Sequence, residues 1–179
     1  NMSVVDLNGD GHLDIVGGPG PAAGNLEDTL GIPYHDYNAY IMAFDHNLQL
    51  LFEPLVFEGF RSYTESYVIS DEGKPMIIAF VNHTGCKDYN PEILKIDPNG
   101  KVIDKYEFLG RQKCVAGFHK RIVNGKSEFI VLWSNGTIDV FSSSLEKLQT
   151  VNLKHNQLSE NHMFILNGRI NNLQGEVIR

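Results

Sequence analysis

Short stretches in which apolar and polar residues alternate run through most of the chain, and none repeats apolar positions with the 3.6-residue period of a helix. Clusters of glycine, asparagine and aspartate separate these stretches, as they do in β-hairpins. Apolar strands are expected after polar turns at 13–16, 75–81, 128–133 and 175–179. The pattern therefore predicts about fourteen short strands and no helix.

Three segments of the chain also resemble one another, namely 39–52, 92–106 and 137–151. Each reads as a strand that ends in an apolar residue, then an Asp or Ser, a tight polar turn and a second strand. The Asp or Ser positions, which we call anchors, are Asp45, Asp97 and Ser142. They lie about 50 residues apart, which is the length of a propeller blade. The residues before them, Phe44, Ile96 and Phe141, are predicted to occupy equivalent places on third strands and to face the next sheet.

Each repeat consists of two consecutive hairpins, and this predicts an all-β fold of β-propeller blades with four antiparallel strands each. A β-sandwich is the alternative architecture. Three and a half blades are expected, and an open arc would leave sheet faces uncovered. The remaining blades are expected from the same longer chain, and closure of the ring by another copy is the alternative. The expected blades span about residues 1–57, 62–109, 113–154 and, for the half blade, 161–179.

The loop between the first two expected strands carries the strongest chemical signal. Asp6, Asn8, Asp10 and Asp14 stand at positions 1, 3, 5 and 9 of a loop with glycine at position 6, and the carbonyl of His12 stands at position 7. Five or more oxygen ligands around a sharp turn are what Ca²⁺ requires. The spacing therefore predicts a calcium site.

The sequence of this loop also has two other interpretations. An EF-hand needs a bidentate Glu at position 12, where this chain has Gly17, and the flanking residues read as strands rather than helices. A hairpin turn of the Asn-Gly or Asp-Gly kind without any metal is the other alternative. The full ladder of four oxygen-bearing side chains favours calcium over such a turn.

The sequence Asp-x-Asn-x-Asp-Gly-x-x-Asp-Ile-Val, followed by Gly-Gly-Pro, resembles an FG-GAP repeat of the integrin-α-like calcium-binding β-propellers. The resemblance covers residues 3–20, and Val4-Val5 stand where that family has Phe-Gly. It implies that the loop joins the first two strands of a blade. It also implies that Asp6, Asn8, Asp10, Asp14 and the carbonyl of His12 hold a structural Ca²⁺.

Composition narrows the function further. The chain has 179 residues and a net charge of −7, and it contains no cluster of Lys and Arg that would neutralise phosphates, so nucleic acid is not an expected partner. No apolar run is long enough to span a membrane.

Cys86 and Cys114 can pair or stay apart, and the sequence leaves this open. Sequons at Asn82 and Asn135 are expected in turns.

The loops between the second and third strands are expected on the face opposite the calcium, and the first two are long. Each of them contains the tripeptide Asp-Tyr-Asn, which begins with Asp36 and Tyr37 in the first loop and with Asp88 and Tyr89 in the second. We expect these four residues to contribute to a ligand site through aromatic stacking and charged acceptors. The structural alternative is that the following asparagines, Asn38 and Asn90, with Asn135 in the third repeat, only cap the next strand.

No zinc spacing, nucleophile elbow or phosphate loop is present in the sequence, which favours a protein without catalytic activity. The sequence thus predicts a calcium-stabilised propeller module for adhesion or ligand recognition, with a protein or carbohydrate as its ligand. Its expected location is extracellular, at the cell surface or periplasmic. The alternative is the propeller portion of a secreted carbohydrate-active enzyme, a lyase or hydrolase.

Overall fold

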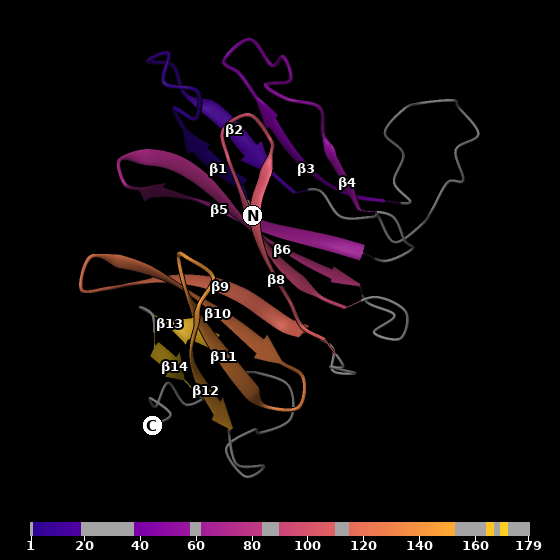
Figure 1. The fold of residues 1–179 in the computed structure, drawn as a ribbon, viewed down its shortest axis with the longest axis vertical. Coiled ribbons are helices and arrows are strands. Elements are labelled where there is room, and N and C mark those ends of the chain that lie inside the picture. The colour runs from indigo at the N-terminus through magenta and orange to yellow at the C-terminus, as the bar shows by residue number, and fades with distance from the viewer. Residues whose placement is uncertain are drawn as a thin grey trace. The chain divides into compact units, whose positions relative to one another are not determined.

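The computed structural model describes residues 2–18, 38–57, 62–83, 90–109 and 115–152, and the backbone of two short strands at 164–166 and 169–171. These residues form strands and turns and contain no helix (Figure 1). The all-β prediction is therefore confirmed. The chain divides into two compact units, Asn1–Gln112 and Lys113–Arg179, and each is described by itself.

The strands form three four-stranded antiparallel sheets, and in each sheet the strands lie side by side in chain order. The first sheet consists of β1 (Met2–Val5), β2 (Asp14–Gly17), β3 (Ala39–Phe44) and β4 (Leu55–Phe57). The second consists of β5 (Ser62–Asp71), β6 (Lys74–His83), β7 (Glu92–Ile96) and β8 (Val102–Glu107). The third consists of β9 (Val115–Val123), β10 (Lys126–Trp133), β11 (Thr137–Ser142) and β12 (Lys147–Asn152). A separate hairpin pairs β13 (Phe164–Leu166) with β14 (Arg169–Asn171).

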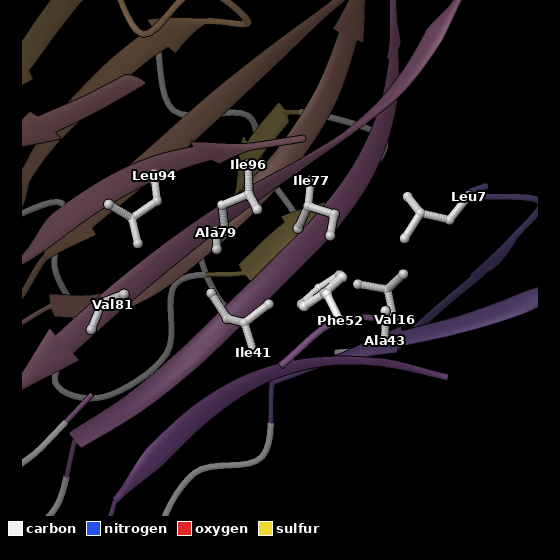
Figure 2. Close-up of a cluster of buried hydrophobic side chains, with 10 residues drawn as sticks. All are labelled: Leu7, Val16, Ile41, Ala43, Phe52, Ile77, Ala79, Val81, Leu94 and Ile96. Carbon is white, nitrogen blue, oxygen red and sulfur yellow. The ribbon is translucent and has the colours of Figure 1, made fainter. Parts of the chain in front are cut away.

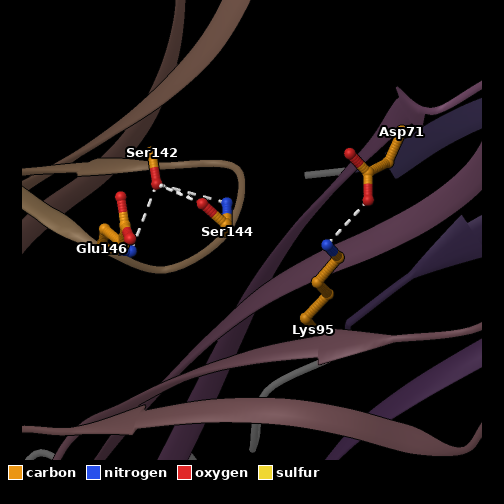
Figure 3. Close-up of polar contacts among 5 residues, drawn as sticks. All are labelled: Asp71, Lys95, Ser142, Ser144 and Glu146. Carbon is orange, nitrogen blue, oxygen red and sulfur yellow. Dashed lines mark hydrogen bonds and ion pairs between the residues drawn. The ribbon is translucent and has the colours of Figure 1, made fainter.

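The turn after each third strand has the same hydrogen bonds in all three sheets. The N–H of the anchor residue donates to the carbonyl four residues later, and the anchor's carbonyl accepts from the N–H three residues later. The anchor side chain, a carboxylate in two sheets and the Ser142 hydroxyl in the third, accepts two further N–H groups of its turn. Figure 3 shows this arrangement at Ser142. The predicted repeat is therefore present in the hydrogen bonding of the turns.

The residues before the anchors are equivalent, as predicted, but the prediction that each faces the next sheet is wrong. Phe44 pairs with Ile15, Ile96 with Ile77, and Phe141 with Phe129, always on the second strand of the same sheet. Ile96 packs toward the first sheet, which precedes it. On β3 it is the neighbouring Ala43 that packs toward the second sheet, and alternation along the strand places Phe44 on the other face.

The first and second sheets share one apolar core (Figure 2). The first sheet contributes side chains from β2 and β3, one from the loop after β1 and one from the segment before β4, and the second contributes side chains from β6 and β7. The buried members are Leu7, Val16, Ile41, Ala43, Phe52, Ile77, Ala79, Val81, Leu94 and Ile96. Burying a Val, Leu, Ile or Phe side chain contributes roughly 1.5–3 kcal/mol, so this core fixes the two sheets face to face.

Two contacts bring the first two sheets close. The hydroxyl of Thr64 on β5 donates to the carbonyl of Tyr40 on β3 at 2.8 Å, and both groups are buried. The ring of Phe52 lies directly over Gly100 in the β7–β8 turn, so that a Cβ added at this glycine would stand 2.5 Å from the ring. The second contact leaves room only for glycine at that turn.

The third sheet contains a buried aspartate whose partners all come from the same sheet. Asp139 on β11 is fully buried. It accepts hydrogen bonds from the Trp133 indole at 2.8 Å and the Thr150 hydroxyl at 2.6 Å, and its distance to the Lys147 ammonium is 2.9 Å. Both carboxylate oxygens therefore have protein partners, which offsets the cost of burying the charge.

The two sequons differ in their surroundings. Asn135 lies exposed in the β10–β11 turn, as expected. Asn82 lies within β6 and is 1% exposed, so the expectation of a turn is wrong there. It follows Val81, a residue of the shared core, and residues 77–82 of β6 are all buried.

Candidate functional site

The loop between β1 and β2 is folded around the side chain of Asp6. Its Oδ1 accepts the N–H groups of Gly9 at 2.8 Å and Asp10 at 3.1 Å, and its Oδ2 accepts the N–H of Gly11 at 3.0 Å. Both glycines have left-handed backbone angles, with φ of 80° and 87°. Residues with a side chain rarely adopt such angles, which explains why glycine alternates with the ligand positions here.

The next two oxygen-bearing side chains continue the ladder. Asn8 Oδ1 accepts the N–H of Asp10 at 2.9 Å, and Asp10 Oδ1 accepts the N–H of His12 at 2.8 Å. The amide of Asn8 also donates to Asp10 Oδ2 at 2.9 Å. This bond, followed by that from His12, holds the pKa of the Asp10 carboxyl below its ordinary value. Asp10 therefore stays ionised, which is the form that binds a cation.

Asp14 differs from the other ligand candidates because it is completely buried. Its Oδ2 accepts the N–H of Leu7 at 2.8 Å and that of Asn8 at 3.3 Å. Its Oδ1 is buried as well and has no hydrogen-bond partner among the described residues. A carboxylate oxygen without a partner is costly to bury, so a ligand that neutralises it would stabilise the fold.

These residues fit Ca²⁺ in chemistry, since carboxylate, amide and carbonyl oxygens are the ligands that this ion prefers. The unpartnered oxygen belongs to Asp14, which ends the loop and is one of the predicted calcium ligands. Within the described part of the chain, however, no three His, Cys, Asp or Glu side chains converge as ready-made metal ligands. In this conformation the carboxylates of Asp6 and Asp10 instead bind the loop's own N–H groups and, for Asp10, the Asn8 amide, although a carboxylate oxygen can accept more than one partner.

The corresponding turns of the other two sheets are much shorter. The β5–β6 turn has Glu72 and Gly73 at its centre, and the β9–β10 turn has Asn124 and Gly125. All four have positive φ, between 50° and 79°, as in the two-residue turns that join tightly twisted hairpins. The carboxylate next to the β5–β6 turn, Asp71, is engaged by the Lys95 ammonium at 2.7 Å (Figure 3).

The predicted ligand-face residues Asp36, Tyr37, Asp88 and Tyr89 lie outside the described residues. The structural alternative, that asparagines cap the next strand, can be checked at Asn135 and Asn90. In the third sheet the side chain of Asn135 accepts the N–H of Thr137 at 3.3 Å and donates to its hydroxyl at 2.9 Å, so capping is confirmed at this position. Asn90 instead donates to the side chain of Glu107 on the neighbouring strand at 3.0 Å.

The sequence did not indicate that His46, which follows the anchor Asp45, belongs to the candidate site. Its ring stacks on the ring of His12, with 4.2 Å between ring centroids and 29° between ring planes. The β3–β4 turn therefore touches the candidate calcium loop. The available signal was the equivalence of the anchors, which places this turn at the same edge of the first sheet as the loop.

No family model matches the chain, and neither the curated proteins nor the solved structures include one that is significantly similar to it. A helix with the length and apolar character needed to cross a membrane is absent from the described residues.

Proposed function

We propose that the chain is a calcium-stabilised β-propeller module that recognises a protein or carbohydrate ligand outside the cytoplasm and has no catalytic activity of its own. One observation supports the calcium most strongly, namely that the buried Oδ1 of Asp14 has no hydrogen-bond partner among the described residues. The propeller is supported by three successive sheets with equivalent turns and by the face-to-face packing of the first two. The FG-GAP resemblance of the loop supports both.

The residues that would hold Ca²⁺ are Asp6, Asn8, Asp10, Asp14 and the carbonyl of His12. When bound, the ion supplies a double positive charge to three carboxylates that stand within nine residues of one another. Without a cation, these carboxylates accept hydrogen bonds from the loop's N–H groups and, for Asp10, from the Asn8 amide. The chain's own contribution is to hold the loop closed through the bonds to Asp6 and to anchor it on β2 through Asp14.

The proposed location follows from the affinity expected for such a loop. Calcium sites of extracellular modules bind with dissociation constants of about 10⁻⁴–10⁻³ M. A site of this strength is filled at the calcium concentrations outside cells and stays empty in the cytosol. The loop would then stabilise the first sheet only after export, which suits an adhesion or recognition module.

The calcium part of the proposal is tested by thermal melting with and without a chelator. Ca²⁺ at about a hundredfold excess over its dissociation constant should stabilise the protein by roughly 2.7 kcal/mol. Asp10→Ala should remove most of this increment. Asp104→Ala is the matched control, because Asp104 is an exposed aspartate on β8, outside the loop. An unchanged melting curve on adding EDTA would refute calcium binding.

The recognition part rests on the four loop residues Asp36, Tyr37, Asp88 and Tyr89. Tyrosine rings would cover an apolar face of a sugar or peptide, while the carboxylates would accept charge-assisted hydrogen bonds, which are roughly twice as strong as neutral ones. The longer loops that carry them make this face the natural binding face of the scaffold.

A glycan and peptide array probed with the wild type and with the Tyr37→Ala/Tyr89→Ala double variant tests this part. We expect the double variant to lose the array signals of the wild type while keeping its melting temperature. Asn135→Ala serves as the control, because this asparagine caps a strand in the third sheet and should lower stability without changing the array profile. If the double variant and the wild type give the same profile, the proposed ligand face is wrong.

A further inference from the structure

The stacked pair of histidines joins two loops that are far apart in the sequence. His12 belongs to the candidate calcium loop, and His46 belongs to the β3–β4 turn. In a sheet whose antiparallel strands follow chain order, the first and third connections emerge at the same edge, which brings these loops together. Both residues are exposed.

His46 is held in place from its own side. The neighbouring Asn47 side-chain amide lies 3.0 Å from His46 Nε2. Asp45 fixes the backbone around it, because its Oδ1 accepts the N–H groups of Asn47 and Gln49, both at 2.8 Å. The turn that carries the His46 imidazole is therefore held by hydrogen bonds of its own residues.

The three equivalent turns provide an internal comparison. The residue after the anchor is His46 in the first sheet, Pro98 in the second and Ser143 in the third. At the same edge only the first sheet has the long loop of oxygen-bearing residues, since the other two have two-residue turns there. Among the described sheets, the aromatic residue thus stands beside the one loop that is predicted to bind calcium.

We propose that His46 is a positioning residue for the calcium loop, which it stiffens by stacking on His12. His12 is then restrained twice, because its N–H also donates to Asp10 Oδ1 at 2.8 Å. Its carbonyl is one of the predicted ligands, so a restrained His12 reduces the conformational entropy that calcium binding has to remove. This inference rests on the calcium binding proposed above.

The test is a calcium titration by isothermal calorimetry of the wild type, His46→Ala and His46→Phe. Aromatic pairs of this kind change an equilibrium by about 2- to 10-fold. We therefore expect His46→Ala to weaken calcium binding by that factor and His46→Phe, which keeps a stacking ring, to bind nearly as the wild type does. Ser143→Ala, the change at the equivalent place in the third sheet, should leave the affinity unchanged.

A second readout separates positioning from general stability. In EDTA, His46→Ala should melt only slightly below the wild type, because the stack is also present without calcium, and the difference should grow when calcium is added. Equal losses with and without calcium would show a structural role and overturn the inference. If the wild type binds calcium and His46→Ala binds it equally well, the role of His46 is wrong and calcium binding stands. If the wild type binds no calcium, the proposed metal site fails, and the role of His46 fails with it.

Discussion

Single residues in this protein share a backbone conformation and yet differ in what surrounds them. Gly100 and Gly73 both lie in hairpin turns, with φ of 80° and 79°. A Cβ at Gly100 would meet the ring of Phe52 at 2.5 Å, whereas a Cβ at Gly73 would have nothing within 4 Å. The first glycine is needed for packing as well as for its backbone angle, and the second only for its angle.

The change of each glycine to alanine should separate these two costs. Gly73→Ala should lower the free energy of unfolding by about 1–2 kcal/mol, because an alanine is strained in the left-handed backbone conformation. Gly100→Ala should cause the same loss and should also displace Phe52 from the shared core, which lowers the free energy of unfolding by roughly 1–3 kcal/mol more. Urea unfolding measures both, and Gly125→Ala, with φ of 76° and open space, should behave as Gly73→Ala does. Equal losses at positions 73 and 100 would show that Phe52 gives way without cost.

At the residue scale the sequence indicated the candidate oxygen ligands, because their spacing is tied to the shape of the loop. It could not indicate that Asp14 is buried or that one of its oxygens has no partner in the described part of the chain, since both depend on how the loop folds over β2. His46 was missed for a similar reason. Its contact with His12 joins positions that only the sheet brings together.

At the scale of strands and turns, most of the fold could be predicted. Alternating apolar residues identified the strands, and the anchors identified the equivalent turns, because an Asp or Ser side chain that binds its own turn leaves a local signature. The same turns hold Leu48 and Leu145 at φ of 62° and 58°, where the second repeat has Gly100. Leucine gives no signal for such a conformation, so the sequence alone did not reveal that the turns are identical.

The direction in which strands face was harder to predict. Alternation along β3 tells which residues share a face, but it does not tell which face meets the neighbouring sheet. Ala43 rather than Phe44 packs toward the second sheet, and a small residue there leaves space for the Phe52 ring in the same core. The apolar pattern predicted that the larger side chain, Phe44, faces the neighbouring sheet. In the structure the smaller side chain, Ala43, faces it, because it fits beside the other residues of the shared core.

At the scale of the whole molecule, two buried aspartates allow a direct comparison. Asp139 has protein partners for both of its carboxylate oxygens, including the Lys147 ammonium. Asp14 has N–H partners for one oxygen and none among the described residues for the other. If calcium completes the surroundings of Asp14, then of these two aspartates only Asp14 should couple stability to the metal.

The most direct measurement is therefore the melting temperature of the wild type, Asp14→Asn and Asp139→Asn, each in excess calcium and in EDTA. The wild type should gain about 5–10 °C with calcium, from roughly 2.7 kcal/mol and about 2–4 °C for each kcal/mol. Asp14→Asn should lose this gain, and Asp139→Asn should keep it while melting lower in both conditions. A wild type that melts identically with and without calcium, or an Asp14→Asn variant that keeps the full gain, would contradict the account.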